Sequence, residues 1–218
     1  MYYKEWIKTR WYLLLMFLAT SGFAGYCLLR LHRVALIKGM GHMWEIMLTH
    51  DVVFVDYLKF VPLVAGLLLA FVQFVPEMYH KCLKLTLHLP VSHLKVVTQM
   101  LSFGVIAILA CDVLNFVILW SYLHEVMAYE LWSRCLLTAL PWYMAGLAAY
   151  LLASWTILEP NWRRRVFNLL VSLLVIKIYF ICDAPASYNS FLPVLLVFTL
   201  ALLILNWISI ARFKEGKE

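Results

Sequence analysis

Six long apolar runs separated by short connections limit what this chain can fold into more than any other feature. They cover approximately residues 11–29, 52–75, 95–122, 135–158, 166–182 and 191–211. About 20 apolar residues suffice for a helix to cross the hydrocarbon core of a bilayer. Because 65% of the 218 residues are apolar or aromatic and 14% are charged, a water-soluble domain could not bury so much apolar surface. The pattern predicts an all-α integral membrane protein, a single domain over residues 1–218 with six transmembrane helices.

The lysines and arginines indicate how these runs are oriented, because cytoplasmic connections of membrane proteins carry an excess of both. With the N-terminus inside, twelve of the 18 fall on the cytoplasmic side and five on the opposite side, and Lys177 lies within the fifth run. Both termini are therefore predicted to be cytoplasmic. The twelve are Lys4, Lys8, Arg10, Lys81, Lys84, Lys95, Arg163, Arg164, Arg165, Arg212, Lys214 and Lys217. Their spread in small groups beside apolar runs is typical of topology signals and argues against nucleic-acid binding.

Two segments outside the runs have amphipathic or apolar character. Residues 1–10 place aromatic side chains near one helical face, which predicts an N-terminal interfacial helix; a frayed extension with aromatic anchors is the alternative. The connection over residues 30–51 is too apolar for a free loop. We expect it to lie on the outer membrane surface or to extend the first two helices.

The connection between the second and third runs is the most informative segment. Its apolar residues recur at helical spacing, and its polar residues fall on other faces. Pro90 would end such a helix, and Ser92 can cap the next. The pattern predicts a short amphipathic helix over residues 77–90 at the cytoplasmic edge, which a soluble partner could grip. The alternative is an ordinary interfacial helix that covers the end of the bundle.

The stretch from Leu83 to Val97, Leu-Lys-Leu-Thr-Leu-His-Leu-Pro-Val-Ser-His-Leu-Lys-Val-Val, resembles the Leu-Pro-(Val/Ile)-Ser loop of type-two ATP-binding-cassette (ABC) exporter permeases. In that family, this loop is the coupling helix that docks on the ATPase subunit. The six runs, cytoplasmic ends and N-terminal interfacial helix are similar to the family's overall plan. The chain departs from the family at residues 78–80, Met-Tyr-His, where a Gly-(Thr/Ser) pair or an Arg is usual.

The resemblance implies a permease subunit in a bacterial inner membrane that couples ATP hydrolysis in a separate ATPase to export. Its partners would be the ABC ATPase, a second permease copy or a related permease, and membrane lipid. The chain itself would be no enzyme and hold no cofactor, with ATP and Mg²⁺ on the ATPase. The implied coupling residues are Glu77, His80, Lys81, Lys84, Leu85, His88 and Leu89; His93 and Arg163–Arg165 are further candidates.

Two ionisable residues fall inside the runs. Asp112 and Lys177 lie about 24 and 18 Å from the cytoplasmic ends of their helices, at 1.5 Å per residue. An unpaired charge in hydrocarbon costs at least about 2.5–3.5 kcal/mol. We expect an intramembrane Asp112–Lys177 pair with Asn115 beside it. The alternative is that Lys177 snorkels to the interface while Asp112 faces the outer water layer.

Small residues predict where helices approach closely. Ala145, Gly146 and Ala149 lie together in the fourth run, and Gly22 and Gly25 lie in the first.

Other function classes find little support in the sequence. The chain lacks a Walker A sequence, which agrees with a separate ATPase. The polar residues within the runs are few and include no nucleophile–base pair, and no run carries paired histidines that would hold a metal or haem. An intramembrane scaffold or enzyme without an ATPase partner is the alternative to the permease.

Overall fold

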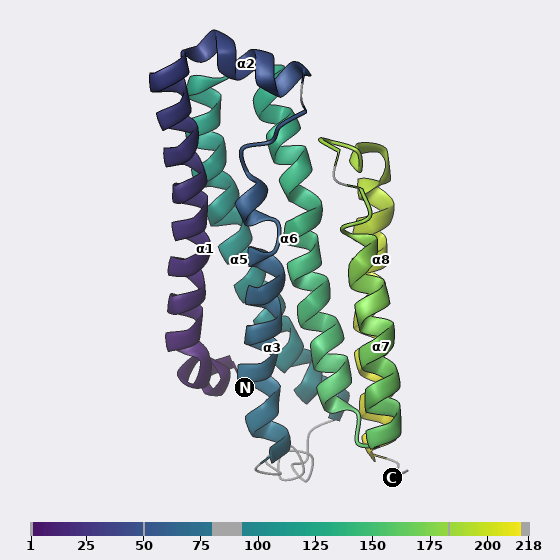
Figure 1. Ribbon diagram of the computed structural model, residues 1–218. Helices are drawn as coiled ribbons and strands as arrows, with labels where there is room; N and C mark the ends of the chain where they lie inside the picture. Colours follow the sequence, from purple (N-terminus) through teal and green to yellow (C-terminus); the bar gives the residue numbers. More distant parts are fainter. Residues whose placement is uncertain (1, 50, 80–92, 183, 215–218) are drawn as a thin grey trace.

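The structure, a computed structural model, describes residues 2–49, 51–79, 93–182 and 184–214. These residues form helices and connections and contain no β-strand (Figure 1). In chain order the elements are α1 (Tyr2–Lys38), α2 (Met40–Thr49), the 3₁₀ turn η1 (Asp56–Leu58), α3 (Val61–Tyr79), α5 (His93–Val126), α6 (Tyr129–Leu158), α7 (Trp162–Ile178), the 3₁₀ turn η2 (Asn189–Phe191) and α8 (Leu192–Lys214).

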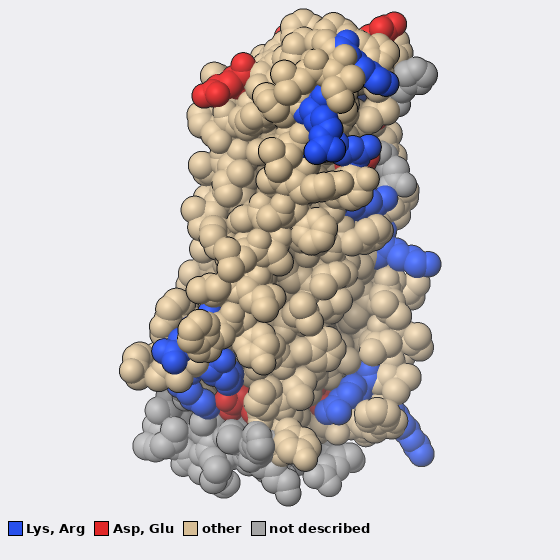
Figure 2. All heavy atoms as spheres, turned by 60° about the vertical axis from the view of Figure 1, so that its left-hand side comes forward, with Lys and Arg blue, Asp and Glu red and all other residues tan. Residues whose placement is uncertain are grey.

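Five helical stretches within the described residues are long and apolar enough to cross a membrane. They are Tyr2–Lys38, Asp56–Tyr79, Lys95–Val126, Tyr129–Leu158 and Asn189–Ile210. Their outward-facing side chains are largely apolar, and in the view of Figure 2 charged side chains lie near the two ends and along one edge between them. This agrees with the predicted all-α, multi-pass membrane protein.

Helix α7, which corresponds to the fifth predicted run, is not among these five stretches, so the total of six spans remains a prediction. It has 17 residues and carries three arginines in its first turn and Lys177 in its last. At 1.5 Å per residue it rises about 26 Å, slightly less than the roughly 30 Å hydrocarbon core.

The N-terminal residues belong to α1 and do not form a separate helix. The helix is continuous from Tyr2 to Lys38, and Figure 1 shows its first turns bending towards the other helices. Near this bend the hydroxyl of Thr9 donates to the carbonyl of Glu5 at 2.8 Å, a bond that often bends helices.

Part of the connection over residues 30–51 extends the first helix, one of the two expectations from its apolar composition. Helix α1 extends through it as far as Lys38, and Gly39, with a φ of 81°, then turns the chain. Helix α2 follows and lies across the end of the bundle (Figure 1), with Met43 and Met47 buried against it.

Pro76 does not end its helix, contrary to the predicted boundary at residue 75. Helix α3 continues to Tyr79 with Pro76 inside it. A proline removes one backbone hydrogen bond, here the one that would end on the carbonyl of Val72. One missing bond is tolerated in a membrane helix when neighbouring groups satisfy the freed backbone.

Helix α6 is the centre of the bundle, because it packs against α3, α5, α7 and α8. Ala145 and Ala149 are fully buried in it. Gly146 faces α3 so closely that a Cβ on Gly66 would overlap the carbonyl of Gly146, and one on Gly146 would lie 2.6 Å from the carbonyl of Pro62. The predicted packing face of the fourth run is confirmed. By contrast, a Cβ on Gly22 or Gly25 would meet no atom of the described residues within 4 Å.

We predict that Gly66→Ala destabilises the bundle by about 1–3 kcal/mol, the usual cost of overpacking, because the group it would overlap is backbone that cannot turn aside. The free energy of unfolding in detergent micelles measures this. Gly22→Ala is the matched control and should leave stability unchanged or slightly raised, since alanine favours a helix over glycine. Equal effects of the two substitutions would contradict the close α3–α6 crossing.

Candidate functional site

The candidate site lies at the end of the bundle that holds both termini, here called the terminal end (Figure 1). The last turn of α3 and the first turn of α5 lie at this same end. They flank residues 80–92, which contain most of the predicted coupling segment. The side chains that join α3 to its neighbours here decide how this end is held together.

Glu77 is the polar centre of the contact between α1 and α3. Its side chain is 4% exposed, and its Oε1 lies 2.9 Å from the Nζ of Lys4 and 3.0 Å from the Nζ of Lys8. Lys8 also donates to the carbonyl of Gln73 at 2.8 Å and pairs with the fully buried carboxylate of Glu5 at 3.1 Å. Buried charges need such partners, so this cluster fastens the start of α1 to the end of α3.

A second chain of hydrogen bonds continues from Gln73 into the bundle. Its amide nitrogen donates to the carbonyl of Met100 on α5 at 2.7 Å, and its amide oxygen accepts from the hydroxyl of Tyr150 on α6 at 2.7 Å. Gln73 and Tyr150 are both fully buried. Through one side chain, α3 is thus linked to both α5 and α6.

The end of α6 is joined to α7 and α8 by another polar group. Arg165 donates to the carbonyls of Glu159 at 2.9 Å and Ile157 at 3.4 Å, which satisfies carbonyls left free where α6 ends. The buried carboxylate of Glu159 accepts a short hydrogen bond from Ser209 on α8 and lies 3.9 Å from Arg212. Arg165 therefore has a structural role, whereas Arg163 and Arg164 are exposed.

Of the predicted coupling residues, the structure describes the side chain of Glu77. Glu77 is buried and ion-paired within the chain, so its carboxylate is occupied by α1. His80, Lys81, Lys84, Leu85, His88 and Leu89 lie outside the described residues, as does the side chain of His93. Their coupling role stays a prediction.

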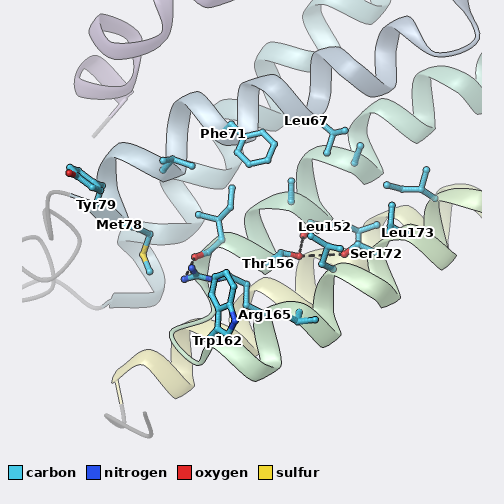
Figure 3. Close-up of a pocket in the computed structure, with 17 residues that line it drawn as sticks. Leu67, Phe71, Met78, Tyr79, Leu152, Thr156, Trp162, Arg165, Ser172 and Leu173 are labelled. Atoms are coloured by element: carbon cyan, nitrogen blue, oxygen red, sulfur yellow. Dashed lines mark hydrogen bonds between the residues drawn. The ribbon is translucent and has the colours of Figure 1, made fainter.

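An apolar groove opens beside this end, between α3, α6 and α7 (Figure 3). Its volume is about 620 Å³. Trp162 and Arg165 of α7 and Met78 and Tyr79 of α3 lie at its terminal end, and Leu67 and Leu173 lie further along. The remaining lining residues are Phe71, Val75, Ala149, Leu152, Ala153, Thr156, Ile157, Val166, Leu169, Ser172 and Ile176.

The groove suits apolar contact more than bond-making chemistry. The hydroxyls of Thr156 and Ser172 lie 3.5 Å apart, and each donates to a carbonyl of its own helix. Neither is placed beside a base that would activate it. Within the described part of the chain, no three His, Cys, Asp or Glu side chains are grouped to hold a metal ion.

Asp112 and Lys177 are not brought together. Asp112 lies on α5 and lines a cavity between α5 and α6, whereas Lys177 lies in the last turn of α7, which packs against α6. Both are described by the structure, and no ion pair joins them. Asn115 donates to Thr20 on α1 at 3.0 Å and to the carbonyl of Cys111 at 2.8 Å. A similar predicted depth in the membrane does not say which neighbour a side chain faces.

Several residues that hold the terminal end together were predicted only as topology signals or not at all. Lys4 and Lys8 are four residues apart, as are Gln73 and Glu77, so each pair lies on one helical face. Two polar faces of complementary charge at the same predicted membrane depth were the signal that could have indicated this contact.

Comparison of the chain with protein-family models, with curated proteins and with solved structures gives no match.

We predict that Glu77→Gln lowers the free energy of unfolding by about 1–3 kcal/mol, because the amide oxygen can still accept a hydrogen bond but the buried negative charge that pairs with Lys4 and Lys8 is lost. Denaturation in detergent micelles measures the loss. A cycle with Lys8→Met should show a coupling of at least about 0.5 kcal/mol. Glu125→Gln, an exposed carboxylate at the other end of α5, is the control and should have no effect; purely additive Glu77 and Lys8 changes would contradict the ion pair.

We also predict that Asp112→Asn and Lys177→Met have independent effects, since the two residues lie on helices that the structure does not pair. Their summed changes in unfolding free energy should match the double variant within about 0.5 kcal/mol. A double variant clearly more stable than that sum would indicate the pair expected from the sequence.

Proposed function

We propose that this chain is the membrane-spanning permease subunit of an ABC exporter, driven by a separate ATPase subunit at the terminal end. The observation that carries the proposal is the Leu-His-Leu-Pro-Val-Ser segment at residues 87–92, whose flanking helices are tied by buried polar side chains to the rest of the bundle. In this proposal, the segment from Glu77 to Pro90 is the coupling element, and its displacement by the ATPase moves the helices of the bundle.

The contacts at the terminal end support this role. Glu77 fastens α3 to α1, and Gln73 fastens α3 to α5 and α6. A displacement of the segment between α3 and α5 would therefore act on four helices together. Such rigid transmission is what alternating between inward- and outward-open states requires.

The proposed topology has six spans, with α7 as the short fifth span and both termini in the bacterial cytoplasm. Described basic residues at the terminal end support this orientation, since they include Lys4, Lys8, Arg10 and Arg163–Arg165. The three arginines at the start of α7 would lie among the headgroups, which leaves the following residues for the hydrocarbon. The ATPase would bind ATP and Mg²⁺, and a second permease copy or a related permease would complete the pathway.

The apolar walls of the groove and the scarcity of polar residues within the helices favour a lipidic or peptide-like cargo over a small hydrophilic one. A hydrophilic cargo would need polar groups along its path to replace its water shell.

The proposal predicts that the tagged chain, purified from native membranes in mild detergent, retains a protein with a Walker A sequence identified by mass spectrometry. Leu85→Asp with Leu89→Asp should abolish this retention, because charges on the apolar face would not fit a docking groove. Leu36→Asp with Leu48→Asp, two exposed leucines at the α2 end, is the matched control and should retain the ATPase.

Two outcomes would overturn the assignment. Unchanged retention with the Leu85/Leu89 variant would show that this segment is not the coupling element. Absence of any such ATPase from the unaltered protein would favour a scaffold or an intramembrane enzyme.

A further inference from the structure

A second cavity lies between α5 and α6 and is separate from the groove at the terminal end. Its volume is about 520 Å³. The lining residues are Leu109, Asp112, Val113, Phe116, Val117, Trp120, Leu136, Leu140, Tyr143, Met144 and Leu147. All but two of these present only apolar or indole groups, so the cavity is an apolar pocket with one acid and one phenol.

Asp112 lies close to the midpoint of α5, which has 34 residues. None of the described residues forms a hydrogen bond or an ion pair with its carboxyl group. An ionisable side chain at this depth is costly, and such residues usually face a partner or a functional site. The cavity offers the open space in which a partner for Asp112 would sit.

Tyr143 supplies an independent observation on the opposite wall. Its side chain is 3% exposed, yet its buried hydroxyl has no hydrogen-bond partner among the described residues. Its ring packs against Phe116 with the centroids 4.8 Å apart, and Phe116 follows Asp112 by one helical turn. The hydroxyl is sealed within the protein, so Asp112 is the polar group that faces the cavity.

We propose that this cavity binds an amphipathic organic cation, a long-chain primary ammonium, taken up from the bilayer. The ammonium group would donate to the carboxylate of Asp112, and the alkyl chain would lie along the leucines and valines of α5 and α6. The aromatic faces of Phe116 and Trp120 favour a cation as well.

Charge complementarity selects this occupant. A neutral lipid chain would fill the volume but give the carboxyl group no hydrogen-bond partner, and an anionic amphiphile would place a second acid beside it. A primary ammonium carries a positive charge and three donors, so it can pair with the carboxylate of Asp112. The binding proposal goes beyond the transport role and does not depend on it, since it can be measured without an ATPase.

Photo-crosslinking tests the proposal on the full chain in nanodiscs of zwitterionic phosphatidylcholine. The probe is a long-chain primary amine with a diazirine in its alkyl chain; its amino group is protonated at pH 7 because such groups titrate near about pH 10. Labelled positions are mapped by peptide mass spectrometry. We expect labelling on residues 109–120 and 136–147, suppressed by excess unlabelled amine but not by the alcohol of the same chain length.

Asp112→Asn should weaken this labelling about tenfold or more, as expected for loss of a hydrogen bond between charged groups, and Asp112→Glu should preserve most of it. Tyr143→Phe should leave it unchanged, because that hydroxyl is sealed from the cavity. Labelling of the groove between α3, α6 and α7 provides the internal control, because it has no acid and should not change with any of these substitutions.

Three results would overturn the proposal. Equal competition by the amine and the alcohol on the unaltered protein would show that the cavity takes any alkyl chain, and this comparison needs no variant that must fold. Undiminished labelling of Asp112→Asn would show that the carboxylate does not take part in binding. A change from dimer to monomer in Asp112→Asn, measured by light scattering, would show that a second copy of the chain is the partner of Asp112.

Discussion

The close approach of α3 and α6 sets the position of the other helices. Backbone meets backbone at Gly66 and Gly146, with Pro62 in the same contact, so α3 and α6 touch there without intervening side chains. Small residues allow such approach, and van der Waals packing then contributes strongly to association in lipid. The groove is lined by the residues that follow this contact towards the terminal end, from Leu67 onward on α3 and from Ala149 onward on α6. The crossing thus explains where the groove begins.

Polar side chains supply the second kind of contact, and several of them lie at the terminal end. Gln73 bonds α5 and α6, and Glu77 bonds α1. Glu159 makes the corresponding contact between α6 and α8. Hydrogen bonds in a low-dielectric interior are stronger than in water. The terminal end is therefore a set of linked helices, on which the proposed ATPase would dock.

The helices were predictable because their cause is local: backbone groups in hydrocarbon must bond within the segment, so a long apolar run becomes a helix. The buried face around Ala145 and Gly146 was predictable because small residues let membrane helices approach closely. The predicted end of the second run at residue 75 was wrong, because a proline such as Pro76 can remain within a membrane helix when neighbouring groups satisfy the freed backbone. The partners of polar side chains were harder to predict. Asp112 and Lys177 have similar predicted depths but lie beside different helices. From the sequence, Glu77 was expected to contact a soluble partner, whereas in the structure it pairs with Lys4 and Lys8. These contacts depend on the rotation of each helix about its axis, which a single apolar pattern fixes poorly.

The ion pairs at the start of α1 imply that its lysines have different roles during membrane insertion and in the folded protein. While the chain is being inserted, Lys4 and Lys8 are free cations of the kind that the insertion machinery counts, and acidic residues weigh little in that count. Once the bundle has assembled, Glu5 and Glu77 balance both lysines. Of the three basic residues before the first apolar run, Arg10 is then the one whose charge these acids do not balance. A segment that is strongly basic in the sequence is therefore nearly neutral in the folded protein.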